Sequence, residues 1–360
     1  MERFACRTEI LCGEGALQAL TQWEGKRLAV ITDPLLSRQG VARKITEVTR
    51  CREVLLMDDI CQEPTIRQAV EGARKLQEFR GDRVIAVGAC HVLDYAKAVR
   101  CFAKAGGTLT AIPAGIGIWE AFTDSAILTH EGRRHILQDE SMRPDRVILD
   151  AGMPEYTARG TLCEEGFSLL AAAVESYCGR RGGILTGLQA REAFSMAWAA
   201  LPAAIGGDRQ ARERVMAASA LAGMAQAYSG EGLCGALCGS LECAFHLPKG
   251  KLAAMVLPAV MGWNVHGVSR GYGELARAAG MGGSSNAAGS ANLRSGLLRL
   301  RRELGLPGSL VRAGIDPKRV WNQAGRIVQM TLEDPRCRNN PITVDDFMVR
   351  RILEEITGRF

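Results

Sequence analysis

Residues 84–87 form a continuous apolar run that is followed at once by four small or polar residues. The run is typical of a strand buried on both faces, and Gly88, Ala89, Cys90 and His91 then turn the chain before helical spacing resumes. In an open α/β sheet such a turn lies at the carboxyl ends of the strands, where backbone N–H groups at a helix N-terminus bind phosphate. The pattern therefore predicts an anion site, and an ordinary strand–helix turn is the alternative.

Further along the chain, titratable side chains stand at helical spacing. Glu242 and His246 are four residues apart and could act as an acid–base pair, although a hydrogen bond on a helix surface explains the same spacing. Lys249 and Lys251 flank a turn after Pro248 and could bind a carboxylate or phosphate, or could belong to a solvated turn.

The chain has twelve cysteines and no CxxC pair, which argues against a zinc ribbon or a redox dithiol. We expect free thiols, because the composition is that of an intracellular protein. Five cysteines could form a soft-metal site, and small buried thiols are the alternative interpretation. These five are Cys163, Cys178, Cys234, Cys238 and Cys243.

Composition narrows the class of protein. The 360 residues are 47% hydrophobic and 23% charged, which is typical of a folded globular chain. The net charge of +6 is spread over mixed-sign stretches without an aromatic-laced basic stripe, so we expect no nucleic-acid partner. We found no apolar segment long enough to span a bilayer and no signal-peptide pattern, so we expect a cytoplasmic protein without a membrane partner.

The elements that must position these residues divide into two halves. Residues 1–152 alternate strands and helices, which predicts a doubly wound parallel sheet, a Rossmann-like dinucleotide-binding domain. Residues 153–360 predict an all-helical domain, with a small and polar loop at 280–293. The expected strands are 27–32, 53–57, 84–87, 109–112 and 146–150. We expect a site in the cleft between the two domains.

Ordered landmarks along the chain resemble the iron-containing (group III) alcohol dehydrogenase family from end to end. They include Glu63-Pro-Thr65, residues 87–97, residues 144–150, residues 257–264 and Asn340-Pro341. The closest similarity is to the branch of ethanolamine- and propanediol-utilisation loci, which is associated with bacterial microcompartments. The resemblance implies a dehydroquinate synthase-like fold, a nicotinamide cofactor, a catalytic Fe²⁺ or Zn²⁺, and a homodimer.

The same resemblance locates the metal ligands of the family, one Asp and three His. In this chain those positions hold Ser168, Ala172, Gly235 and Lys249. A hydroxyl, a methyl, a hydrogen and an ammonium do not offer the lone pairs that a divalent ion requires. We therefore expect neither iron nor zinc at these positions.

The nicotinamide side also departs from the family pattern. Gly-Gly-Gly-Ser becomes the turn at 88–91, whose side chains crowd a pyrophosphate, and the hydroxyl-rich loop becomes a segment containing Gly115 and Trp119. Arg134 stands where the family has a lysine near the nicotinamide ribose. Asp33 could accept hydrogen bonds from an adenosine ribose or could simply stabilise an Asp-Pro turn. We expect no bound cofactor, or at most weak NAD(H) binding.

Three functions remain open. The favoured one is a catalytically impaired pseudoenzyme that pairs with an active alcohol dehydrogenase paralogue or a microcompartment component. The second is changed chemistry that uses Glu242, His246 or Lys249 in the cleft. The third is an active NAD-dependent dehydrogenase of a short-chain alcohol, if the ligand positions have been matched out of register.

Overall fold

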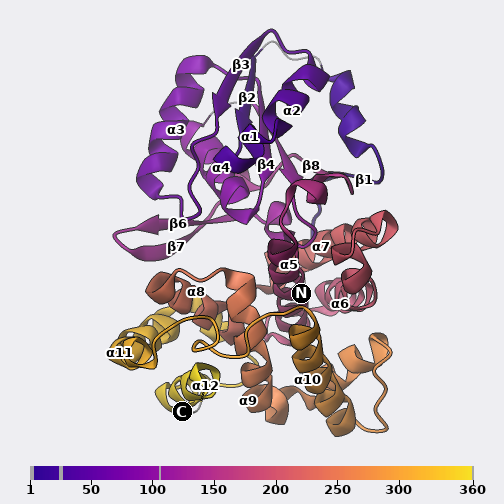
Figure 1. Ribbon diagram of the computed structural model, residues 1–360, viewed down its shortest axis with the longest axis vertical. Helices are drawn as coiled ribbons and strands as arrows, with labels where there is room; N and C mark the ends of the chain where they lie inside the picture. The colour runs from indigo at the N-terminus through magenta and orange to yellow at the C-terminus, as the bar shows by residue number, and fades with distance from the viewer. Residues whose placement is uncertain (1–3, 24–26, 105–106, 359–360) are drawn as a thin grey trace. The chain divides into compact units, whose positions relative to one another are not determined.

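The computed structural model describes residues 4–23, 27–104 and 107–358. They form two compact units. The first, the sheet unit, comprises residues 5–158 together with 207–223, and the second, the helical unit, comprises residue 4 with 159–206 and 224–358. The expected fold, a parallel α/β sheet domain and an all-helical domain, is confirmed (Figure 1).

The sheet unit is built on six parallel strands in the order β1-β8-β5-β4-β2-β3. The strands are β1 (Glu9–Cys12), β2 (Arg27–Ile31), β3 (Glu53–Met57), β4 (Arg83–Gly88), β5 (Thr108–Pro113) and β8 (Arg146–Leu149). The helices of this unit are α1 (Pro34–Arg38), α2 (Val41–Thr49), α3 (Ile66–Phe79) and α4 (Cys90–Ala103).

The central strands β2, β4 and β5 of this sheet are buried on both faces, whereas the edge strands β1 and β3 are partly exposed. Val30, Ile85 and Val87 pack with α1 and α2 in one apolar cluster. Successive side chains of a strand point to opposite faces, so the buried Val84 and Ala86 face the other side, where α3 and α4 lie (Figure 1). Coverage of both faces explains why these strands are continuous apolar runs rather than alternating ones.

A separate antiparallel hairpin, β6 (Ser125–His130) and β7 (Arg133–Gln138), leaves the parallel sheet. Its turn has positive φ at Glu131 (48°) and Gly132 (68°), the geometry that suits a two-residue hairpin loop. We did not predict this hairpin from the sequence.

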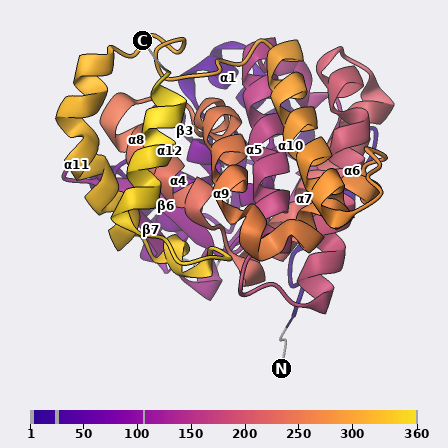
Figure 2. The same cartoon turned by 90° about the horizontal axis from the view of Figure 1, so that it is seen from below.

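The helical unit packs around α9. Its helices are α5 (Arg159–Cys178), α6 (Ile184–Ile205), the end of α7 (Arg209–Ser229), α8 (Leu233–Phe245), α9 (Lys249–Ala278), α10 (Asn286–Glu303), α11 (Pro317–Glu333) and α12 (Asp346–Thr357). Residues of α9 contact α5, α8, α10 and α12, and Figure 2 shows α9 in the middle of this group. α9 is long and apolar enough to cross a membrane, but 61% of its most apolar stretch is buried in the fold, as in the core helix of a globular domain.

The loop expected at 280–293 is wrong from Asn286 onward. Ser285 accepts a hydrogen bond from the Ala288 amide and thereby caps α10. Leu293, Leu297 and Leu300 then recur on one buried face, which stabilises the helix despite its small and polar first turn.

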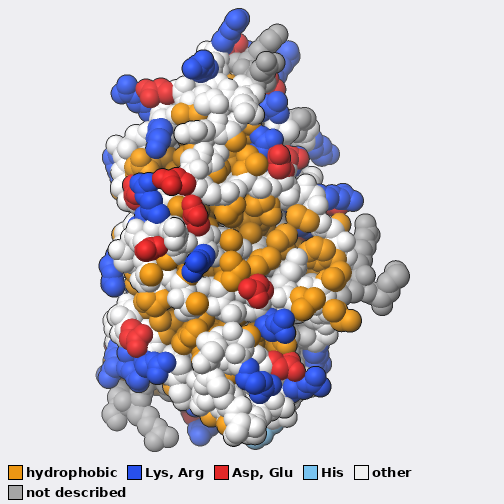
Figure 3. Space-filling model, turned by 90° about the vertical axis from the view of Figure 1, so that its right-hand side faces the viewer, with side chains coloured by type: hydrophobic (Ala, Val, Ile, Leu, Met, Phe, Trp, Pro, Cys, Tyr) orange, Lys and Arg blue, Asp and Glu red, His pale blue; other side chains and the backbone are white. Residues whose placement is uncertain are grey.

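The surface carries charge of both signs. Figure 3 shows one face on which basic and acidic side chains lie scattered among hydrophobic ones. On this face the basic side chains do not form one continuous patch.

Candidate functional site

In the sheet unit, the predicted anion-binding turn lies between β4 and α4. Ala89 is the N-cap residue of α4, with φ −78° and ψ 177°, and its methyl side chain makes no capping hydrogen bond. Gly88 is required there, because a Cβ at this position would lie 2.7 Å from Cβ of Val92. A helix N-terminus preceded by glycine is the type of place where a phosphate binds. The anion site and the crowding of a pyrophosphate at 88–91 both stay predictions.

Four charged or titratable groups influence one another beside this turn. Burial lowers the pKa of His91, the charges of Asp33 and Asp94 oppose that shift, and Arg134 adds to it. His91 is therefore neutral at pH 7 and can exchange hydrogen bonds without carrying charge. Two of the predicted residues, Asp33 and Arg134, thus lie close enough to a third, His91, to influence its pKa.

Asp33 has a structural task in this arrangement. Its Oδ1 accepts hydrogen bonds from the amides of Leu35 and Leu36 at 2.8 and 2.9 Å, and it is the N-cap of α1. The turn interpretation therefore has direct support, while the ribose interpretation stays a prediction.

The loop after β5 packs inward. Gly115 is buried, Trp119 is only 5% exposed, and the Ala114 amide donates to the Gly88 carbonyl at 3.0 Å. The loop is thereby tied to the turn before α4. The side chain of Trp119 is therefore buried within the sheet unit.

A buried ion pair that sequence reasoning did not single out holds this loop. Lys97 is fully buried, and its Nζ donates to the Glu120 carbonyl at 2.5 Å, the Ser125 carbonyl at 2.9 Å and Thr123 Oγ1 at 3.2 Å. Asp94 lies 3.3 Å from the same Nζ and accepts a bond from the Ile127 amide at 3.1 Å. The spacing of Asp and Lys, three residues apart on a helix, was the available sequence signal.

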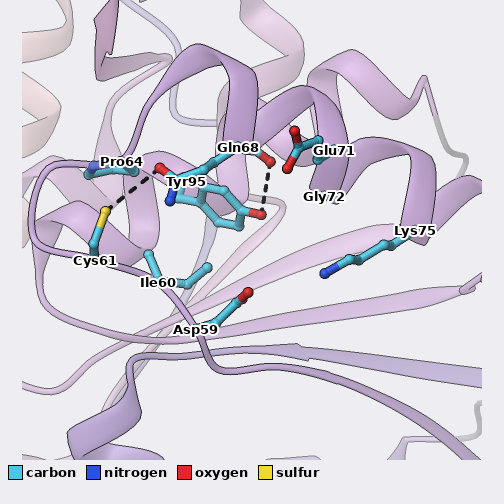
Figure 4. Close-up of a pocket in the computed structure, with 9 residues that line it drawn as sticks. All are labelled: Asp59, Ile60, Cys61, Pro64, Gln68, Glu71, Gly72, Lys75 and Tyr95. Carbon is cyan, nitrogen blue, oxygen red and sulfur yellow. Dashed lines mark hydrogen bonds between the residues drawn. The ribbon is translucent and has the colours of Figure 1, made fainter. Parts of the chain in front are cut away.

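A small cavity of the sheet unit lies away from these residues, between the segment 59–64, α3 and Tyr95 (Figure 4). Its volume is about 40 Å³, which holds little more than a water molecule. Tyr95 O–H donates to the Gln68 carbonyl at 3.2 Å, and burial raises the pKa of Tyr95 to about 12. The cavity is too small for a substrate.

In the helical unit, α5 presents the first two positions that the family resemblance assigns to metal ligands. Ser168 is half-buried and Ala172 is 2% exposed, and the Ala172 carbonyl accepts a bond from Gln226 Nε2 at 2.7 Å. A hydroxyl and a methyl group supply at most one weak donor atom to a metal.

The other two positions adjoin a buried cluster of four charges. Lys249 Nζ lies 2.9 Å from Oε1 of Glu231, and Arg336 Nη1 lies 2.9 Å from Oε2 of the same carboxylate. Arg336 also pairs with Asp334 at 2.7 Å. Burial opposes ionisation of Glu231, but the two cations outweigh it and lower its pKa to about 2. We call Glu231, Lys249, Asp334 and Arg336 the charge cluster.

A second buried carboxylate, Glu175 on α5, binds the N-terminus of α8. Its two oxygens accept bonds from the amides of Cys234 at 2.7 Å and Gly235 at 3.0 Å. Burial and the neighbouring Glu231 raise the pKa of Glu175 to about 7, although the backbone donors oppose this shift. Sequence reasoning missed this residue, since a Glu inside an apolar helix gives no sign of its partner.

The next two candidates, Glu242 and His246, lie at the C-terminal end of α8. His246 is exposed and ends α8 in the left-handed conformation (φ 55°), and its amide donates to the Glu242 carbonyl at 2.8 Å. This backbone bond explains the spacing of the two residues. Among the described residues, no group of three or more His, Cys, Asp or Glu side chains is arranged to hold a metal ion. All twelve cysteines are free thiols, as expected.

The sequence of the chain matches two family models. One, described as "Iron-containing alcohol dehydrogenase", matches residues 7–151, and the other, "Fe-containing alcohol dehydrogenase family, C-terminal", matches residues 163–357. The chain belongs to the iron-containing alcohol dehydrogenase family.

Individual relatives agree over the full length. The chain is 29% identical to 1-propanol dehydrogenase PduQ of Citrobacter freundii, covering 99% of this chain and 100% of the relative. It is also 29% identical to EutG of Salmonella typhimurium, named as a probable alcohol dehydrogenase, covering 95% and 91%. The solved iron-containing alcohol dehydrogenase of Thermococcus thioreducens has the same fold, with a TM-score of 0.89 at 23% identity over 98% and 99% of the two chains. The resemblance to the propanediol- and ethanolamine-utilisation branch is confirmed.

Family membership corrects our expectation about cofactor and metal. We expected no bound cofactor, NAD(H) binding that is weak at most, and neither iron nor zinc. This is wrong, because the chain belongs to a family defined by iron and by alcohol dehydrogenation, and its relatives carry those names. Nicotinamide cofactors carry hydride in reactions of this kind, and the turn at 88–91 is where we predicted a phosphate.

The donor set at the four ligand positions is a separate observation. The side chains of Ser168, Ala172 and Lys249, with Gly235, do not fit Fe²⁺ or Zn²⁺ by donor chemistry, and a cation next to Lys249 would meet a like charge. We therefore derive no reaction step through a metal ion from these residues.

Proposed function

We propose that this chain is a nicotinamide-binding member of the iron-containing alcohol dehydrogenase family whose alcohol chemistry is impaired and which acts mainly as a partner of other proteins. The charge cluster is the observation that carries this proposal. Oxidation of an alcohol is accelerated by a metal ion, a cationic group or hydrogen-bond donors that stabilise the alkoxide as the hydroxyl loses its proton.

Lys249 is the cation at the ligand positions, and its charge is already compensated. The Glu231 carboxylate lies 2.9 Å from its ammonium, so little of the positive charge remains for a developing alkoxide. Freeing Lys249 would leave Glu231 buried with one fewer partner, which is costly. Both points favour slow turnover.

Nicotinamide binding belongs to the sheet unit in this proposal. The amides at the N-terminus of α4 would hold the pyrophosphate, and neutral His91 and the cation Arg134 would stand beside it. Bound nicotinamide supplies the hydride acceptor or donor of the family reaction. The Asp94–Lys97 pair keeps the loop after β5 in place next to this turn.

A second candidate is an active NAD-dependent dehydrogenase of a short-chain alcohol. The 29% identity over the whole of a 1-propanol dehydrogenase favours it. The same relative and EutG support a place in the cytoplasm or inside a microcompartment, and a partner there. A homodimer, an active dehydrogenase paralogue or a shell component are the partners we propose, with no nucleic acid and no membrane.

One assay separates the two candidates. Propanol oxidation and propanal reduction are measured with NAD(H) and NADP(H), after incubation with Fe²⁺ or with Zn²⁺, and the metal content of the same samples is determined. The proposal expects nicotinamide binding with turnover many decades below the ordinary value of about 10 s⁻¹. Turnover within a few decades of that value rejects impairment and establishes the active dehydrogenase.

Purification from the native cell then tests the partner role. Co-elution of a second dehydrogenase subunit or of a shell protein at fixed stoichiometry supports the role, and light scattering gives the mass of the complex. A pure homodimer without companions, together with low turnover, argues against it.

A further inference from the structure

The charge cluster joins three segments of the helical unit that are far apart in the sequence. Glu231 lies just before α8, Lys249 is the first residue of α9, and Arg336 lies in the short 3-10 helix Pro335–Asn339. The side chains of the three residues are only 10%, 16% and 13% exposed. With Asp334 the cluster contains two negative and two positive charges, so it is neutral as a whole.

Two glycines make room for this cluster. A Cβ at Gly235 would lie 2.7 Å from Cδ of Glu231, and a Cβ at Gly239 would lie 2.6 Å from Nη2 of Arg336. Both glycines are inside α8, where glycine is otherwise a poor choice because it is a weak helix former. Glycine stands at these two positions because charged side chains fill the space that a larger side chain would need.

These glycines are the positions at which the family resemblance places the third metal ligand and a proton-relay histidine. A histidine at either position would occupy the space now taken by Glu231 or Arg336. Gly235 makes room for Glu231, Gly239 makes room for Arg336, and Lys249 and Arg336 both pair with Glu231, so the five residues form one connected set.

We infer that the charge cluster is a coupled set of residues that ties α8, α9 and the 3-10 helix Pro335–Asn339 together at the place where the family resemblance puts the metal ligands. The three segments are held together by ion pairs between side chains of this chain. The inference concerns stability and goes beyond the proposed function, because it holds whether or not the protein oxidises an alcohol.

The test is a pair of double-mutant cycles read by thermal unfolding. Gly235→Ala is made in the wild type and in Glu231→Gly, because Cβ of Glu231 would itself lie 2.8 Å from the new Cβ. Gly239→Ala is made in the wild type and in Arg336→Ala. Alanine is the better helix former, so in open space it raises the unfolding temperature. Here we expect each alanine to lower it in the wild type and to lower it less, or to raise it, in the matched background.

Two controls separate volume from charge and from general helix effects. Glu231→Gln keeps the volume and removes the charge, so Gly235→Ala should remain destabilising in it. Gly325→Ala on α11, where a Cβ would have no atom within 4 Å, should not lower the unfolding temperature.

Every outcome decides the inference. If Gly235→Ala fails to fold in the wild type but folds in Glu231→Gly, the coupling is supported in its strongest form. If the alanine effects are the same in both backgrounds, or if neither glycine substitution destabilises the wild type, the residues are not coupled and the inference is wrong.

Discussion

Lys97 shows how a single buried charge can determine the shape of a binding region. Its ammonium is fully buried and bonds two main-chain carbonyls, a threonine hydroxyl and Asp94. Nothing in the bonding pattern requires Lys97 to touch a ligand. Its task is to hold the segment 120–125 against α4, whose N-terminus fits a phosphate.

We predict that Lys97→Met destabilises the protein by about 3–5 kcal/mol, because it leaves Asp94 buried without its cation. Urea denaturation measures the loss. Lys44→Met, on the exposed face of α2, is the matched control and should change stability by less than about 0.5 kcal/mol. An equal and small effect of both substitutions would contradict the structural role of the pair.

Asp33 is a residue whose two interpretations can be separated by substitution. Asp33→Ala removes the cap of α1 and should cost about 1 kcal/mol. Asp33→Asn keeps a good capping side chain and removes the charge, so stability should be retained. Titration with NADH then decides the second role: unchanged affinity in Asp33→Asn means that the carboxylate serves the helix alone, whereas a clear loss means that it also binds the cofactor.

At the scale of elements, α8 depends on a carboxylate supplied by another helix. Glu175 of α5 binds the first amides of α8, and its pKa is about 7 against an ordinary value of 4.5. Between these pH values the folded protein keeps a proton that the unfolded chain has released. The free energy of unfolding therefore falls as pH rises from about 4.5 to about 7.

The predicted size of this effect is about 3 kcal/mol over that interval, from a shift of roughly two and a half pH units. Denaturation of the wild type and of Glu175→Gln at pH 5, 6 and 7 measures it, since glutamine does not titrate. Glu231, with its pKa lowered to about 2, titrates below this range and does not interfere. Parallel pH profiles of the two proteins would contradict the buried proton.

The sequence predicted those elements whose pattern is local. Apolar runs identified β2, β3, β4, β5 and β8, and the Ala- and Leu-rich stretches identified helices within 163–264, whereas α11 and α12 were not assigned. The hairpin β6–β7 was missed, because its alternation is short and partly exposed and its turn signal, Glu131-Gly132, is a common dipeptide. The start of α10 was missed, because its first turn is rich in small polar residues.

At the scale of the whole molecule, the order of family landmarks predicted the fold. The arrangement of side chains around the candidate site could not be predicted from the sequence. Glu231 and Arg336 are 105 residues apart, and nothing local marks either as a partner of Lys249. The family resemblance identified the positions at 235 and 249 but not the side chains that fill the space beside them. Ion pairs between residues far apart in the sequence depend on the tertiary fold. The spacing of apolar residues along the chain does not indicate which charged residues will meet.

The cysteines provide a test of the fold as a whole, because they are distributed over both units and differ in exposure. Cys6, Cys12, Cys61 and Cys90 are exposed, whereas Cys163, Cys234 and Cys238 are buried. Burial raises the pKa of Cys163, and a hydrogen bond with Cys238 followed by burial raises that of Cys234, so the thiolate form that reacts is suppressed in both.

We predict that a thiol reagent modifies the four exposed cysteines of the native protein rapidly and the three buried ones only after unfolding. In denaturant all twelve should react, since none is paired in a disulfide. Mass spectrometry of peptides after timed labelling assigns each site. Fast labelling of Cys234 or Cys238 in the native protein would mean that α8 is not packed as described, and a total below twelve in denaturant would mean that a disulfide or another modification is present.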